Sequence, residues 1–92
     1  MPTEKNQDID KIKKTILEYL KQLTSMPGIS YSTKLIESRI IDSLNLVQLI
    51  IFIESNFGLK IRMFGIHLEN FATIDVLAAY ILEKTGNKKV FP

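Results

Sequence analysis

The chain contains no cysteine and no tryptophan, and it has a single histidine. Without cysteine there can be neither a disulfide cross-link nor a thiolate metal site. One histidine also argues against a zinc site made of protein ligands. The folded state must therefore be stabilised by packing, and any chemistry that needs a thiol must bring its sulfur from outside the chain.

Long hydrophobic runs are also missing. The longest strongly apolar run, residues 46–53, is interrupted by Gln48 and is far shorter than the ~20 residues that a membrane span requires. Residues 1–8 are polar and charged, unlike the apolar core and small-residue cleavage site of a secretory signal. We expect a soluble cytoplasmic protein without a membrane span.

The sequence has little excess charge of either sign. Its formal net charge is +2, and most of the basic residues alternate with carboxylates along the chain. A basic stripe for nucleic acid is therefore not expected. A small helical DNA-binding module remains an alternative, but residues 43–56 and their flanks lack the cluster of Arg, Lys and Asn that phosphate and base contacts demand.

Apolar residues recur at helical spacing in three segments, and no strand-like alternation or hairpin signal competes with them. The first segment runs from about Asp8 to residue 23 and ends before a loop rich in Pro, Gly, Ser and Thr at 26–33. The second spans about 43–56, with Gly58 placed to end it. The third opens at Thr73, a good helix N-cap, and ends at Gly86. The stripes are Ile9, Ile12, Ile16, Leu20 and Leu23; Leu46, Leu49, Ile50, Ile53 and Phe57; and Ile74, Leu77, Ala78 and Ile81.

Between the second and third stripes, residues 64–71 predict a further helix of one or two turns, with Ile66, Leu68 and Phe71 as anchors. The predicted fold is all-α, a small four-helix bundle with a short third helix. Residues 8–86 form its single domain, which should bury about 60 to 65% of the surface of the unfolded chain. Residues 1–7 and 87–92 are expected to be flexible.

The most informative motif is Asp42-Ser43-Leu44, where the second predicted helix begins. It is followed by Phe57-Gly58 at the end of that helix and by Phe71-Ala72-Thr73-Ile74 at the start of the last one. Across residues 9–85 these motifs, in this order, resemble acyl carrier proteins and the related carrier domains of polyketide, peptide and D-alanine-activating systems. An isolated triplet is weak support, whereas three motifs in register are specific.

The resemblance implies a bundle of acyl-carrier-protein type that is not an enzyme. In that family the serine, here Ser43, carries covalent 4′-phosphopantetheine, whose thiol holds an acyl or aminoacyl group as a thioester in fatty-acid, polyketide, peptide or dedicated biosynthesis. Partners would be a phosphopantetheinyl transferase, an activating ligase and downstream synthase enzymes, with the chain itself a monomer. The resemblance also implies that Asp42 helps to present Ser43 to the transferase, near its Mg²⁺.

The residues themselves suit this role. A serine in the first turn of a helix is accessible to another enzyme, and the helix N-terminus favours the negative charge of an attached phosphate. No histidine stands near Ser43 in the sequence to activate it as in a hydrolase. The competing interpretation is structural, since Asp42 or Ser43 could simply cap the helix.

The second helix carries more apolar surface than one core needs. Its core stripe leaves other residues on a neighbouring face near Ser43, and in the family this face docks partner enzymes. The expected partner-binding residues are Leu44, Val47, Gln48, Ile51 and Glu54. Val47 could equally belong to the core, and Glu54 could be a solvated charge.

The chain departs from the family in charge. Many family members carry acidic residues along this helix, whereas here only Asp42 and Glu54 are charged between 42 and 56. Weak electrostatic steering argues against service to a standard fatty-acid synthase and favours a stand-alone carrier with a dedicated adenylating ligase. The remaining alternative is a relative that is never modified and acts only as an interaction domain.

Overall fold

The computed structural model describes residues 2–61 and 67–90, with side chains described for 9–61 and 67–85. These residues form three α-helices, α1 (Pro2–Thr24), α2 (Ser43–Phe57) and α3 (Ile74–Val90), and one 3-10 helix, η1 (Leu68–Phe71). The described part of the chain contains no strand. The all-α prediction is confirmed, with three α-helices where four helices were expected.

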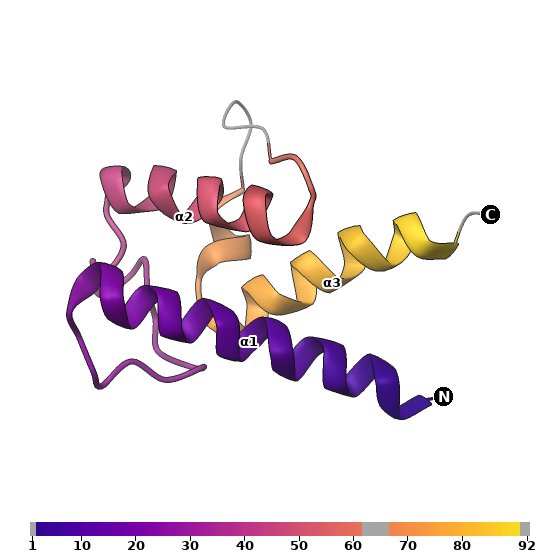
Figure 1. Ribbon diagram of the computed structural model, residues 1–92. Helices are drawn as coiled ribbons and strands as arrows, with labels where there is room; N and C mark the ends of the chain where they lie inside the picture. Colours follow the sequence, from indigo (N-terminus) through magenta and orange to yellow (C-terminus); the bar gives the residue numbers. More distant parts are fainter. Residues whose placement is uncertain (1, 62–66, 91–92) are drawn as a thin grey trace.

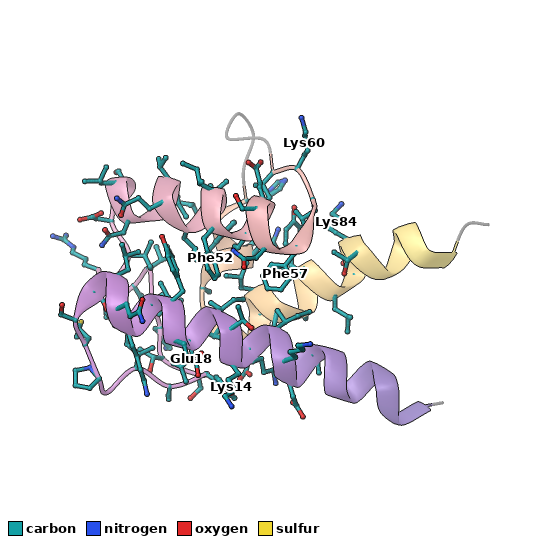
Figure 2. The ribbon with its side chains drawn as sticks, viewed as in Figure 1. Lys14, Glu18, Phe52, Phe57, Lys60 and Lys84 are labelled. Atoms are coloured by element: carbon teal, nitrogen blue, oxygen red, sulfur yellow. The ribbon has the colours of Figure 1, made fainter. Side chains whose placement is uncertain are left out.

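Figure 1 shows α1 running along the molecule, with α2 and α3 both returning in the opposite direction. The start of α1 and the end of α3 therefore lie at the same end of the molecule. Tyr19 of α1 stacks on Phe52 of α2, with ring centroids 4.0 Å apart. Lys13 of α1 pairs with Asp75 of α3 at 3.0 Å. Helix α1 thus contacts both of the other helices, and Phe52 is a packing residue (Figure 2).

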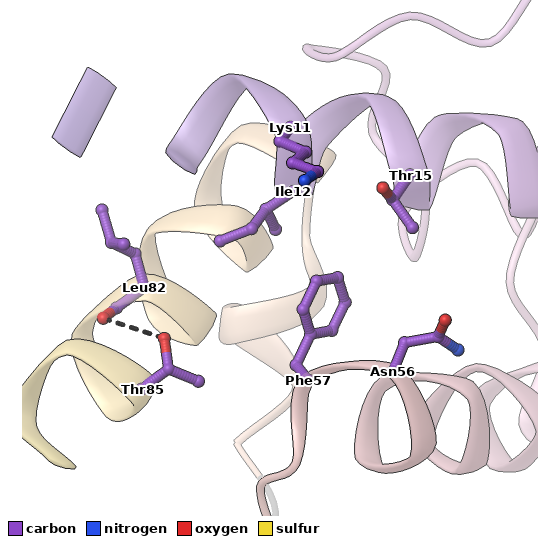
Figure 3. Close-up of a pocket in the computed structure, with 7 residues that line it drawn as sticks. All are labelled: Lys11, Ile12, Thr15, Asn56, Phe57, Leu82 and Thr85. Carbon is purple, nitrogen blue, oxygen red and sulfur yellow. Dashed lines mark hydrogen bonds between the residues drawn. The ribbon is translucent and has the colours of Figure 1, made fainter. Parts of the chain in front are cut away.

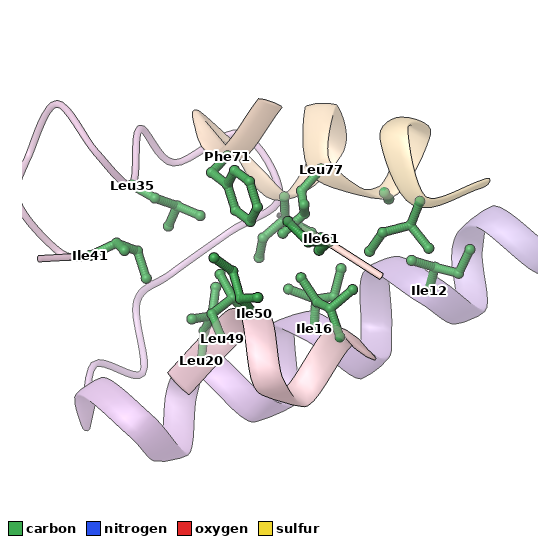
Figure 4. Packing of buried hydrophobic residues seen from close by; sticks show 14 of the residues in the cluster. Ile12, Ile16, Leu20, Leu35, Ile41, Leu49, Ile50, Ile61, Phe71 and Leu77 are labelled. Carbon is green, nitrogen blue, oxygen red and sulfur yellow. The ribbon is translucent and has the colours of Figure 1, made fainter. Parts of the chain in front are cut away.

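The core is built from the predicted stripes. From α1, Ile12, Ile16 and Leu20 are buried, while Ile9 and Leu23 are half-buried at its edge. All four expected residues of α3 are buried, and so are Leu49, Ile50 and Ile53 of α2, whereas Leu46 and Phe57 of the α2 stripe are half-buried. Figure 4 shows Leu49, Ile50 and Leu77 in this cluster. The loop and the segments around η1 add Ile29, Leu35, Ile41, Leu59, Ile61 and Phe71. Burial on this scale, at about 25 cal/mol per Å² of apolar surface, is the main stabilising term in this cysteine-free fold.

Two predicted helix ends are wrong. Helix α1 begins at Pro2 rather than near Asp8, because proline is well suited to a first helical position and nothing between Pro2 and Asp8 breaks a helix. Helix α3 continues through Gly86 to Val90, since an internal glycine costs only about 1 kcal/mol relative to alanine. The expected flexibility of 1–7 and 87–92 stays a prediction.

The other helix ends agree with the sequence. Ser25, with φ of 57°, follows the last residue of α1, and Gly58, with φ of 67°, ends α2 in the left-handed conformation. At α3, the Thr73 hydroxyl accepts the Val76 N–H at 3.1 Å. Thr73 is therefore the N-cap that the sequence predicted.

The short helix is smaller than expected. Phe71 is buried, as predicted, but Leu68 is 46% exposed and is not a core anchor. Phe64 and Ile66, which were expected in the same segment, lie outside the described residues. A single 3-10 turn has no periodic stripe, so contacts with the rest of the chain decide which of its residues is buried.

No helix in residues 2–61 and 67–90 combines the length and apolar character needed to cross a membrane.

Candidate functional site

The loop that leads to Ser43 is held in place by backbone hydrogen bonds. The Leu35 N–H donates to the Ala72 carbonyl at 2.8 Å, which joins the loop to the residue after η1. The Ile41 N–H in turn donates to the Leu35 carbonyl at 3.0 Å. Both Leu35 and Ile41 are buried, so the chain enters α2 from a fixed direction.

Asp42 is the N-cap of α2. Its backbone is extended, and its Oδ1 accepts the backbone N–H of Asn45 at 2.9 Å. Its carbonyl accepts the Leu46 N–H at 2.9 Å, the first hydrogen bond of the helix. These contacts satisfy backbone groups that would otherwise be unpaired at the helix start. The capping interpretation therefore holds for Asp42, and its role in presenting Ser43 stays a prediction.

Ser43 is the first residue of α2, and its side chain is exposed. Its hydroxyl makes no hydrogen bond to any residue in the described part of the chain. The single histidine, His67, precedes η1, where it is exposed. The hydroxyl is thus open to an external catalyst and is not paired with a base among the residues that the structure describes.

A shallow pocket lies beside Ser43. Its volume is about 320 Å³, and it combines apolar residues with two charged ones. Its lining residues are Ile36, Arg39, Ile41, Asp42, Ser43, Leu46 and Leu68. An adjoining pocket of about 350 Å³ shares Ile36 and Leu68 and extends along η1 to Thr73. Together they provide a partly apolar surface, with charged residues along it, that begins beside Ser43.

Three apolar side chains of α2 are exposed next to this site. Leu44 is 69% exposed, Ile51 56% and Val47 38%. Their spacing of three, four and seven residues places them on one side of the helix with the exposed Gln48. Val47 therefore belongs to the outer face and not to the core. We call Leu44, Val47, Gln48 and Ile51 the outer face of α2.

The Glu54 carboxylate is engaged in a hydrogen bond within the chain. It is half-buried, and its Oε2 accepts the backbone N–H of Ile61 at 2.8 Å. This contact ties the segment after α2 back to the helix. Asp42 and Glu54 are the charged residues of α2 and its N-cap, and of these two only Asp42 is exposed. A partner-binding role for Glu54 remains a prediction.

A further cavity lies away from Ser43. Its volume is about 460 Å³, and it lies where the last turn of α2 meets α1 and α3 (Figure 3). It is lined by Lys11, Ile12, Thr15, Asn56, Phe57, Leu82 and Thr85. Because Ser43 stands at the opposite end of α2, this cavity is not part of the candidate site. Among the described residues, no group of three or more histidine or carboxylate side chains could hold a metal ion.

The sequence leaves two roles open for Tyr19, Tyr31 and Phe64: lining a cleft that shelters a bound chain, or packing in the core. Tyr19 stacks on Phe52 and donates its hydroxyl to the Gln48 carbonyl at 3.2 Å. Tyr31 lies beneath the Lys13 ammonium, 5.6 Å from the ring centroid. Both rings therefore serve packing, and Phe64 lies outside the described residues.

Sequence reasoning missed Arg39. This residue lines the Ser43 pocket and adopts a left-handed backbone conformation, with φ of 63°. Asparagine and glycine signal such a conformation, whereas arginine does not. Nothing in the local sequence therefore identified Arg39 as part of the site.

The two possible roles of Asp42 can be separated by substitution. Asp42→Ala should lower the free energy of unfolding by about 1 kcal/mol, because the Asn45 N–H loses its acceptor. Asp42→Asn should unfold like the wild type, since asparagine is an equally good N-cap, yet it lacks the charge expected to face the Mg²⁺ of a transferase. Urea unfolding and the rate of loading by a transferase measure the two effects. Wild-type loading of Asp42→Asn would leave capping as the only role.

No protein-family model matches the chain, and a search of curated proteins found no match either.

Proposed function

We propose that this protein is a carrier whose Ser43 hydroxyl receives 4′-phosphopantetheine from coenzyme A. The observation that carries the proposal is the exposed Ser43 as first residue of α2, with its hydroxyl unpaired among the described residues. Such a hydroxyl can enter the active site of another enzyme without unfolding of the chain. The Asp42-Ser43-Leu44 motif in register with the later motifs supports the same assignment.

In the attachment step, a bond forms between Ser43 Oγ and the phosphorus that bears the pantetheine. The bond from that phosphorus to the bridging oxygen of the nucleotide breaks, and adenosine 3′,5′-bisphosphate leaves. The hydroxyl proton passes to a base of the transferase, because no described residue of this chain accepts it. When attached, the group supplies a thiol that holds an acyl or aminoacyl cargo as a thioester.

Within this proposal the fold is a four-helix carrier bundle in which η1 is the short third helix. The buried Phe71 and the Leu35 contact to Ala72 give η1 a fixed place between the loop and α3. Leu68 of η1 faces the same pocket as Ser43. The short helix would thus border the surface along which an attached arm can lie.

The decisive experiment is intact-mass analysis of the full chain after incubation with a phosphopantetheinyl transferase, Mg²⁺ and coenzyme A. We expect the wild type to gain one phosphopantetheine group, with adenosine 3′,5′-bisphosphate released in equal amount. An unchanged mass with several transferases of broad specificity would refute the proposal. It would leave the second candidate, an interaction domain that is never modified, which is favoured by the exposure of Leu44 and Ile51.

Both candidates predict that the outer face of α2 docks a partner. Burial of one leucine or isoleucine side chain contributes roughly 1.5–3 kcal/mol, so Leu44→Ser or Ile51→Ser should weaken docking about tenfold or more. The measurement is the dependence of transferase or ligase rate on carrier concentration. Val76→Ser is a matched control, because Val76 is 41% exposed on α3, away from this face. Equal losses in all three variants would contradict a specific docking face.

The sparse charge of this face also predicts which partner it suits. Because α2 has no exposed carboxylate beyond its first turn, electrostatic attraction steers the encounter with a partner enzyme only weakly. The rate of loading should therefore change only a few-fold between low and high salt. This property fits a dedicated adenylating ligase with an apolar docking site better than a synthase with a strongly basic one. A steep loss of loading rate at high salt would contradict this choice of partner.

A further inference from the structure

Among the described residues, Arg39 is the one cation that lines the pocket beside Ser43. Its side chain is exposed, and it forms no ion pair with any residue in the described ranges, whose two ion pairs are Lys13 with Asp75 and Lys34 with Glu37. It precedes Ser43 by four residues, and both line one pocket of about 320 Å³. An unpaired guanidinium thus shares a small surface with the hydroxyl proposed to be modified.

Modification of Ser43 changes the charge balance of this pocket. A phosphodiester on the Ser43 hydroxyl places one negative charge next to the Asp42 carboxylate, whose Oδ1 already accepts the Asn45 N–H. Two like charges at adjacent residues repel each other. His67, which precedes η1, and Lys84 of α3 do not line the pocket, and Lys34 is paired with Glu37. Arg39 is therefore the side chain placed to offset this charge beside the N-terminus of α2.

The geometry points to Arg39 as the positioning residue that pairs with the phosphate on Ser43, an inference that rests on the proposed function. Guanidinium presents several N–H donors in a planar fork that matches two phosphate oxygens at once. A fixed phosphate would direct the arm across the apolar wall formed by Ile36, Ile41 and Leu68. The side chain of Arg39 therefore has its role in the modified protein, and the unmodified protein does not need it.

The backbone at Arg39 supports a role for its side chain. With φ of 63°, Arg39 occupies the left-handed region, where glycine is unstrained and a long side chain is not. Stability alone would favour glycine at this position. Arg39→Gly is consequently a clean variant, because it removes the cation and leaves the loop in a conformation that glycine adopts readily.

The test compares the thermal midpoints of unmodified and modified protein for the wild type, Arg39→Gly and Arg39→Lys. For each protein we take the thermal midpoint of the modified form minus that of the unmodified form. We expect this difference to be several degrees higher in the wild type than in Arg39→Gly, with Arg39→Lys between them. High salt should remove the difference. Lys21→Ala, which deletes an exposed cation of α1 that lines no described pocket, should behave like the wild type.

A second readout needs no substitution. The side-chain N–H signals of Arg39 in the NMR spectrum should shift when the protein is modified. The control is unmodified protein transferred into the same buffer, in which the arginine signals should not shift. An identical change in midpoint in wild type and Arg39→Gly, or unmoved Arg39 signals in modified protein, would overturn the pairing and leave the carrier function standing. A wild type that gains no mass would overturn both.

Discussion

Ser43→Ala should abolish the gain of mass completely, because the Ser43 Oγ is the acceptor in the proposed step and alanine has no oxygen at that position. The first turn of α2 is the only point in the described chain where an exposed serine follows an aspartate cap. The transferase must bind the structure around the hydroxyl as well as the hydroxyl itself. Loss of one oxygen atom should therefore reduce loading from full to undetectable.

The same substitution should leave the fold intact. The Ser43 side chain is exposed and forms no hydrogen bond with described residues, and the cap is provided by Asp42. We expect a change in the free energy of unfolding within about 0.5 kcal/mol, as for most surface substitutions. Ser55→Ala is the matched control, since Ser55 is an exposed serine near the other end of α2. Residual mass gain in Ser43→Ala, or its loss in Ser55→Ala, would place the attachment elsewhere.

Most of the fold could be predicted because three helices carry long periodic stripes. The residues expected in the core of α3 are all buried, and α2 has the expected start and the expected left-handed Gly58. Periodicity reports which side of a helix is buried, and caps report where it starts. Both signals are local, so sequence alone is enough to identify them.

The remaining features depend on contacts that are not local. Glu54 is engaged by the Ile61 N–H, seven residues later, and neither residue type indicates such a bond. Leu68 and Phe71 belong to one short turn, yet only Phe71 is buried. The start of α1 and the end of α3 differ from the predicted positions because Asp8 and Gly86 carry only statistical preferences, each of about 1 kcal/mol or less, and a helix can continue through both residues.

The candidate site shows the same division. The position of Ser43 follows from the helix start, which the motif identifies. The pocket beside it does not, because its walls come from the loop, from α2 and from η1. Arg39 enters that pocket through a left-handed backbone conformation that arginine rarely adopts. A site built by several segments therefore becomes visible only when those segments are placed together.

Phe71→Ala should be the most destabilising single substitution in η1 and its surroundings. Phe71 is 1% exposed and belongs to the central apolar cluster (Figure 4). Truncation of a buried phenylalanine typically costs about 3–5 kcal/mol, through lost burial and the cavity left behind. For a small domain with a total stability of about 5–15 kcal/mol this is a large fraction. The urea midpoint should fall by about 1 M or more.

Leu68→Ala is the matched control in the same 3-10 turn. Because Leu68 is 46% exposed, its truncation should change the free energy of unfolding by no more than about 0.5 kcal/mol. Leu68 nevertheless lines the pocket beside Ser43, so this variant removes part of the apolar wall without loosening the core. Equal destabilisation by both substitutions would show that η1 is not anchored through Phe71. Without that anchor, Leu68 and the pocket wall that it forms would have no fixed position relative to Ser43.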